Sequence, residues 1–249
     1  MNVAPRWPYP RLIGHRGGGT LAPENTLAGL RLAQRYGYAG VEFDVMLSGD
    51  GTPVLIHDDT LERTTNGRGA VADRSDAELA RLDAGSWHSP AYAGEPLPTF
   101  AQAGELCREL GLWANVEIKP APGHEAETGR RTALLARELW QGAELAPLLS
   151  SFSPVALAAA AQVAPDLPRG LLYRRAPDTW HADVLRLGCF SLHCNYRHVT
   201  PRLVHEAVRY GVPLVCYTVN DPEEARRLLG LGVAAVITDR LDLLLPQRL

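Results

Sequence analysis

The sequence has no run of apolar residues long enough to cross a membrane. A membrane-spanning helix needs about 20 such residues, whereas the longest apolar stretch, residues 155–163, is rich in alanine and includes Gln162. Residues 1–10 contain prolines and Arg6 but no apolar run of signal-peptide length. We therefore expect a cytoplasmic protein without integral membrane contact.

The sequence also lacks an excess of one charge and any paired cysteine motif. Its 25 Lys and Arg residues nearly balance its 28 Asp and Glu residues, and the net charge is −3 with no block of one sign. This distribution argues against a nucleic-acid-binding groove. The four cysteines form no CxxC pair and lie mostly in apolar segments. We expect reduced core cysteines, not disulfides or a zinc site.

Short apolar runs alternate with amphipathic segments through most of the chain. The apolar runs predict strands over residues 12–14, 41–46, 54–56, 113–118, 148–152, 170–173, 189–194, 213–219 and 234–238. The amphipathic segments predict helices over residues 25–36, 99–110, 125–140, 154–163, 178–187, 201–210 and 222–229. Repeated βα units of this length favour a parallel sheet covered by helices. We predict an α/β fold, a (β/α)8 TIM-type barrel that forms a single domain over residues 1–249.

Two features indicate that this barrel is somewhat distorted. Nine strand-like runs compete for eight places, and the turn residues 48–51 leave no room for a helix between the second and third runs. Residues 60–98 contain no clear periodic element and are rich in Gly, Asp, Arg and Ser. A segment of this length in a compact domain is usually functional or an inserted subdomain. We expect an insertion after the third strand that lies over the barrel mouth.

Glu42 and Asp44 stand two residues apart in a predicted strand. Because side chains alternate along a strand, both carboxylates point to the same face. On a buried face they would repel each other and lose hydration, and a divalent cation between them would remove both costs. Taken alone, the pair is either part of a metal site or part of a solvated strand face.

Other polar residues follow predicted strands at the ends where such a barrel forms its active site. They are His15, Arg16, His57, Asp58, Glu117, Asn220 and Lys119, the only lysine of the chain. Glu117 and Lys119 share a face by the same two-residue spacing. Glu117 would complete an oxygen-only ligand set with the first carboxylate pair, and such a set suits Ca²⁺ or Mg²⁺ better than zinc.

The chemistry of these residues suits phosphodiester hydrolysis. Arg16 and Lys119 beside a metal would bind a phosphate. His15 and His57 can act as general acid and general base near neutral pH. The metal and the two cations would stabilise the charge that grows on the phosphorus oxygens. His193, near the end of the predicted strand 189–194, is expected to be a hydrogen-bonded core residue instead.

A series of motifs runs in a fixed order from about residue 11 to residue 241. The motifs are His15-Arg16-Gly17, Ala22-Pro23-Glu24-Asn25-Thr26, Glu42-Phe43-Asp44-Val45, Asp50-Gly51 with Pro53-Val54, His57-Asp58, Arg63-Thr64-Thr65, Glu117-Ile118-Lys119, Ser151-Phe152, Tyr217-Thr218-Val219-Asn220 and Thr238-Asp239. In this order they resemble the glycerophosphodiester phosphodiesterases. The resemblance implies a TIM-like barrel and metal-dependent hydrolysis of glycerophosphodiesters to sn-glycerol 3-phosphate and an alcohol. It also implies a characteristic insertion after the second histidine, which fits residues 60–98.

The resemblance implies roles for individual residues as well. One divalent cation, Ca²⁺ or Mg²⁺, would be held by Glu42, Asp44 and Glu117. His15 and His57 would form the acid/base pair, and Arg16 and Lys119 would contact the phosphate.

The resemblance further implies that Phe152 and Tyr217 bind substrate. The family commonly has tryptophan at the position of Tyr217, so the aromatic wall is kept while the size and polarity of the alcohol pocket stay open. Glu24 and Asn25 also match the family, but we expect them only to cap the first helix.

Two other functions stay open. A lysophospholipase D-type phosphodiesterase acting on a lipid would need an apolar entrance, which Trp87, Tyr92 and Leu97 could supply. A non-catalytic barrel that binds phosphoryl ligands should lack a histidine or a metal ligand, and none is missing. The expected partner is a small glycerophosphodiester. The sequence leaves open the alcohol, the metal, the oligomeric state, the order of the two histidines and whether water or the glycerol 2-hydroxyl is the nucleophile.

Overall fold

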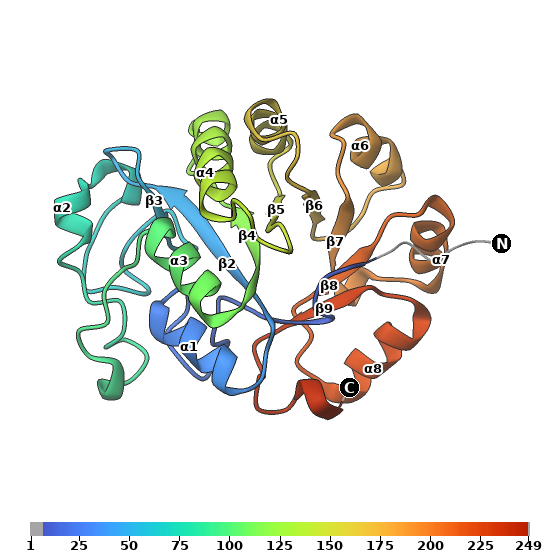
Figure 1. Cartoon of the computed structure of the whole chain (residues 1–249), viewed down its shortest axis with the longest axis horizontal. Coiled ribbons are helices and arrows are strands. Elements are labelled where there is room, and N and C mark those ends of the chain that lie inside the picture. The colour runs from blue at the N-terminus through green and yellow to red at the C-terminus, as the bar shows by residue number, and fades with distance from the viewer. Residues whose placement is uncertain (1–6, 249) are drawn as a thin grey trace.

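The computed structural model describes residues 7–248, and within them eight parallel strands close into a barrel ringed by helices (Figure 1). The predicted TIM-type barrel is therefore confirmed. Its strands are β1 (Leu12–Gly14), β2 (Gly40–Leu47), β4 (Trp113–Ile118), β5 (Leu148–Ser151), β6 (Arg169–Tyr173), β7 (Ser191–Asn195), β8 (Leu214–Tyr217) and β9 (Ala235–Thr238). The pairing of Gly14 with Val41 joins β1 to β2 and closes the barrel. Residues 1–6 and 249, the ends of the predicted single domain, lie outside the described residues.

The third predicted strand is not part of the barrel. β3 (Pro53–Leu55) runs antiparallel to the last residues of β2, with Leu55 opposite Val45. The turn between them is closed by the Ser48 carbonyl, which accepts a hydrogen bond from the Gly51 N–H at 2.9 Å. β2 therefore extends beyond its neighbours, and β3 brings the chain back toward the mouth. His57 reaches the mouth from this returning strand and not, as the sequence suggested, from the end of a parallel strand.

Helices cover the outside of the barrel, each next to the strands that flank it in the chain (Figure 1). They are α1 (Leu27–Arg35), α3 (Phe100–Leu110), α4 (Glu125–Leu139), α5 (Pro154–Val163), α6 (Trp180–Arg186), α7 (Pro201–Tyr210) and α8 (Pro222–Leu231). Capping side chains set several starts: Thr200 and Asp221 accept hydrogen bonds from the first turns of α7 and α8, and each precedes a proline.

Alternation along β2 divides its residues between the core and the site. Val41, Phe43 and Val45 point outward and pack in the apolar layer between the barrel and the helices. The intervening Glu42 and Asp44 point into the barrel. At the opposite, amino-terminal end the barrel is filled by an aromatic cluster of Trp7, Tyr9, Trp113 and Phe190. The polar site and the apolar plug thus occupy opposite ends of one barrel.

The insertion over residues 60–98 has its own small core. It contains the short helix α2 (Asp76–Leu79) and the single turns η1 (Val71–Asp73) and η2 (Pro90–Tyr92). Leu61, Leu79 and Leu97 are buried in a cluster that includes residues of the β2–β3 hairpin. The insertion is therefore a packed unit that holds its residues in place beside the mouth.

The expectations about cysteines and membrane-spanning segments can be compared with the structure of residues 7–248. All four cysteines are free, and three of them are buried. No described helix combines the length and the apolar composition needed to cross a bilayer. The cytoplasmic location stays a prediction.

Candidate active site

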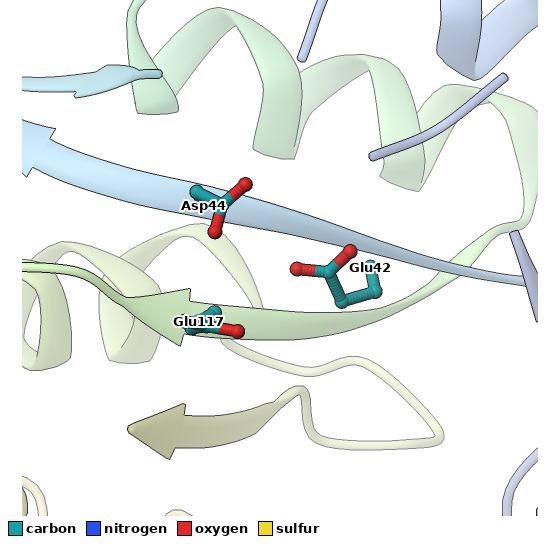
Figure 2. A group of neighbouring side chains, drawn as sticks. All are labelled: Glu42, Asp44 and Glu117. Atoms are coloured by element: carbon teal, nitrogen blue, oxygen red, sulfur yellow. The ribbon is translucent and has the colours of Figure 1, made fainter. Parts of the chain in front are cut away.

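Three buried carboxylates lie together at the mouth of the barrel. Glu42 and Asp44 belong to β2, and Glu117 stands opposite Asp44 on the neighbouring strand β4 (Figure 2). One carboxylate oxygen of each residue lies within 4.8 Å of the other two. The three residues are only 2%, 2% and 8% exposed, which excludes the solvated strand face. Three carboxylates in this arrangement could hold a metal ion, and oxygen ligands suit a hard divalent cation.

The charges of this acidic triad (Glu42, Asp44 and Glu117) are only partly compensated by the protein. Burial and the neighbouring carboxylates raise the pKa of Glu42 well above its ordinary range. Burial and Asp44 raise the pKa of Glu117 to about 8. Burial also opposes ionisation of Asp44, but nearby Arg16 and Lys119 outweigh it and lower the pKa of that carboxyl. One oxygen of Glu42 and one of Glu117 are buried without a hydrogen-bond partner, and a bound cation would satisfy both.

The raised pKa of Glu117 predicts a pH dependence of stability in the metal-free protein. The folded state holds the Glu117 proton up to about pH 8, whereas an ordinary glutamate loses it near 4.5. The folded state therefore binds more protons between these values, and the free energy of unfolding should fall as pH rises from 5 to 8. Urea unfolding in chelator at both pH values measures this slope.

Glu117→Gln is the matched variant, because it keeps the shape and cannot ionise. We expect its slope between pH 5 and 8 to be smaller and its stability at pH 8 in chelator to exceed that of the unaltered protein. Equal slopes in the two proteins would show that Glu117 is not the carboxyl that holds the extra proton in the folded state.

His57 lies against Lys119 beside the acidic triad. Its Nε2 is 2.6 Å from Lys119 Nζ, and its Nδ1 is 2.6 Å from Asp58 Oδ1. The ammonium can only donate, so these contacts fit an imidazole whose Nδ1 carries the proton and whose Nε2 offers a lone pair. Burial, with help from Arg16 and Lys119, lowers the pKa of His57 and favours this neutral form.

The second histidine, His15, makes contacts comparable to those of His57. Its Nδ1 is 2.5 Å from Asp239 Oδ1, and its Nε2 lies 3.8 Å from Glu42 Oε2. Asn220 fixes this aspartate, because its Nδ2 donates to Asp239 Oδ2 at 3.0 Å and its Oδ1 accepts from the Asp239 N–H at 2.8 Å. Each histidine thus has a carboxylate on Nδ1 and directs Nε2 toward the triad.

Arg16 links the triad to the loop that follows β1. Its backbone N–H donates to Glu42 Oε2 at 2.9 Å, and its Nε lies 3.5 Å from Asp44 Oδ2. Its φ of +49° is unusual for a residue with a side chain. Glu24 accepts a hydrogen bond of 2.6 Å from Arg16 Nη1 and holds the far side of the guanidinium.

The expected capping role of Glu24 and Asn25 was wrong. The side chain that caps α1 belongs to Thr26, which accepts a hydrogen bond from the Gly29 N–H. Asn25 instead donates to Asp44 Oδ2 at 2.9 Å and accepts from the Asp44 N–H at 3.0 Å. Both residues therefore serve the site, where they fix an arginine and a carboxylate.

Phe152 and Tyr217 form an aromatic corner near the site. Their ring centroids are 6.1 Å apart in an edge-on arrangement, and Phe152 is 45% exposed. The Tyr217 hydroxyl donates to the Tyr173 carbonyl at 3.0 Å. Phe152 also lines a cavity of about 270 Å³ together with Glu117 and Lys119. Phe152 therefore lies beside one carboxylate of the acidic triad.

A second cavity, of about 460 Å³, lies between His15 and the insertion. Its lining includes Arg16, Glu24, Asp239 and Trp87. The three residues proposed as an apolar entrance do not form one: Leu97 is buried in the insertion, and the Tyr92 hydroxyl donates to the Leu21 carbonyl. Of the three, Trp87 lines this cavity, and most of the other lining residues are polar or charged. His193 is a buried core residue paired with Ser191 Oγ at 3.0 Å, as expected.

The structure brings all the predicted polar site residues together at one mouth, and it adds several that the sequence did not assign. The additions are Glu24, Asn25, Arg63 and Asp239, and the structure also gives roles to Asp58 and Asn220. Each belongs to a motif already noted in the chain, so motif membership was the available signal. The pairing of Asp239 with His15 could not be read from local spacing, because the two residues are 224 positions apart.

Comparison with known proteins gives consistent results. A model of the glycerophosphoryl diester phosphodiesterase family matches residues 15–243. A glycerophosphodiester phosphodiesterase of Caldanaerobacter subterraneus subsp. tengcongensis is 37% identical over 229 residues, which cover 92% of this chain and 93% of the relative.

Solved structures agree with this similarity. An Oleispira antarctica phosphodiesterase, solved in complex with the product sn-glycerol-3-phosphate, superposes with a TM-score of 0.89 at 38% identity. The match covers 96% of this chain and 95% of that one. A glycerophosphodiester phosphodiesterase from Agrobacterium tumefaciens gives a TM-score of 0.79 at 27% identity, covering 93% and 97% of the two chains. The similarity therefore extends over nearly the whole chain.

Proposed function

The chain belongs to the glycerophosphoryl diester phosphodiesterase family of hydrolases, and from this we propose that it cleaves glycerophosphodiesters to sn-glycerol 3-phosphate and an alcohol at the mouth of its barrel. The observation that carries the proposal is the acidic triad with two histidines beside it, each of which has an aspartate on its Nδ1. No predicted histidine or carboxylate is missing, which argues against a barrel that only binds phosphoryl ligands.

Glu42, Asp44 and Glu117 would hold one hard divalent cation, Ca²⁺ or Mg²⁺. Their mutual repulsion and the two unpartnered oxygens support this role. When bound, such an ion neutralises phosphoryl charge and stabilises the transition state. Arg16 and Lys119 form ion pairs with Asp44, which hold them in place. As fixed cations they would bind the remaining phosphate oxygens.

The two histidines would divide the proton transfers. His57 is the candidate base for the nucleophile, either water or the glycerol 2-hydroxyl: its Nε2 lone pair, which accepts from Lys119 here, would take the proton once Lys119 binds the phosphate instead. His15 directs Nε2 toward a carboxylate and is held by Asp239, which suits a protonated ring that gives its proton to the leaving oxygen. Phe152 and Tyr217 would contact the organic part of the substrate.

The proposed function predicts a preference for a small, polar diester. We expect a higher kcat/KM for glycerophosphocholine than for lysophosphatidylcholine, because most residues that line the cavity beside Trp87 are polar or charged. Parallel assays that quantify released sn-glycerol 3-phosphate and free choline measure both substrates. Faster choline release from the lipid would favour the lysophospholipase D-type alternative.

A further inference from the structure

We propose that Arg63 is a positioning residue for the reaction, through which the insertion holds one histidine and one arginine of the site. This inference rests on the proposed function. Arg63 belongs to the Arg63-Thr64-Thr65 motif, which has no role in the chemistry described above. Its guanidinium lies between two carboxylates, and each of these in turn contacts a different residue of the mouth.

The first carboxylate belongs to Asp58 and leads to His57. Arg63 Nε donates to Asp58 Oδ2 at 2.5 Å, and Nη2 donates to Oδ1 at 3.0 Å. The same Oδ1 is 2.6 Å from His57 Nδ1. Because a guanidinium is planar and rigid, this paired contact fixes the plane of the carboxylate. The orientation of the imidazole, and thus the direction of Nε2, follows from it.

The second carboxylate belongs to Glu24 and leads to Arg16. Arg63 Nη1 and Nη2 donate to the two oxygens of Glu24, each at 2.8 Å. Glu24 Oε1 also accepts the 2.6 Å hydrogen bond from Arg16 Nη1. The Glu24 side chain is only 13% exposed, so loss of one cationic partner would leave a largely buried carboxylate undercompensated. Arg16 would then lose its fixed direction toward the phosphate.

The backbone of Arg63 is well placed to act as an anchor. Leu61 is buried in the core of the insertion, and the neighbouring Thr64 and Thr65 are buried as well. The Thr65 hydroxyl donates to the Leu61 carbonyl at 2.7 Å. The Arg63 side chain itself is 43% exposed, so water screens its charge. Its fork geometry, which lysine cannot reproduce on two carboxylates at once, carries the effect.

The test compares Arg63→Lys with Arg68→Lys, an exposed position of the same insertion. We expect Arg63→Lys to lower kcat/KM for glycerophosphocholine by about 10-fold or more, the usual effect of losing a supporting hydrogen-bond partner. The loss should appear in both kinetic constants: kcat should fall because His57 is misoriented, and KM should rise because Arg16 is no longer directed toward the phosphate. Arg68→Lys should match the unaltered protein. Assays are run well below the melting temperature of each variant.

A second variant separates positioning from folding. Arg63→Ala opens space for a free guanidinium ion, and added guanidinium chloride at millimolar concentration should restore part of its activity, whereas methylammonium chloride should not. Unaltered activity in Arg63→Lys, or a loss without any rescue and without a change in KM, would overturn the inference. Absence of turnover in the unaltered protein would instead refute the proposed function.

Discussion

Replacing His15 with alanine is expected to lower kcat for glycerophosphocholine by about 10²–10⁴-fold, the usual contribution of a general acid. The choline oxygen is a poor leaving group and would have to depart without a proton. His57→Ala should cause a loss of similar size, because the nucleophile would keep its proton. Released sn-glycerol 3-phosphate measures both. The two rings are partly exposed and belong to the mouth, so both variants should fold.

A substrate with a good leaving group distinguishes the two histidines. p-Nitrophenolate departs without protonation, so glycerophospho-p-nitrophenol should be cleaved by His15→Ala at a rate much closer to that of the unaltered enzyme. His57→Ala should remain slow on this substrate, because activation of the nucleophile is still needed. The assignment rests on the neighbours of the two Nε2 atoms, which are Lys119 for His57 and Glu42 for His15. Equal losses on both substrates in His15→Ala would show that His15 is not the acid.

The central part of the site could be predicted from the sequence because it depends on local spacing. Two-residue steps place Glu42 beside Asp44 and Glu117 beside Lys119, and parallel strands bring their ends to one mouth. Burial and distance then confirm that the three carboxylates meet. The substrate-binding role of Phe152 and Tyr217 was predicted from the family resemblance, and it stays a prediction.

Strand direction could not be predicted in the same way. A short apolar run such as residues 53–55 has the same composition whether it pairs parallel or antiparallel. Only the extension of β2 beyond the barrel explains why His57 reaches the site from a returning strand. The turn signal at residues 48–51 was the one local indication of this.

The residues that support the site depend on contacts between distant parts of the chain. Arg63 meets Glu24 across 39 residues, and Asp239 meets His15 across 224. No periodicity relates such positions, and Glu24 has a sufficient local explanation as a capping residue. That explanation failed because Thr26 takes the cap, which leaves Glu24 free to bind two arginines.

Removal of divalent cations is expected to abolish turnover, because the acidic triad would lose the charge that offsets it and attracts the phosphate. Ion binding should also stabilise the folded state, by about 2.7 kcal/mol at 100 times the dissociation constant. Melting curves with and without chelator measure this shift. Glu117→Gln should show little of it, because the variant lacks one of the three anionic ligands.

The most direct test of the account is the release of sn-glycerol 3-phosphate from glycerophosphocholine by the same protein before chelation, after chelation and after addition of Mg²⁺ or Ca²⁺. We predict full loss in chelator, recovery with at least one of the two ions, and no recovery in Glu117→Gln. Turnover that persists in chelator, or that recovers equally in Glu117→Gln, would contradict the assignment of the acidic triad as the metal site.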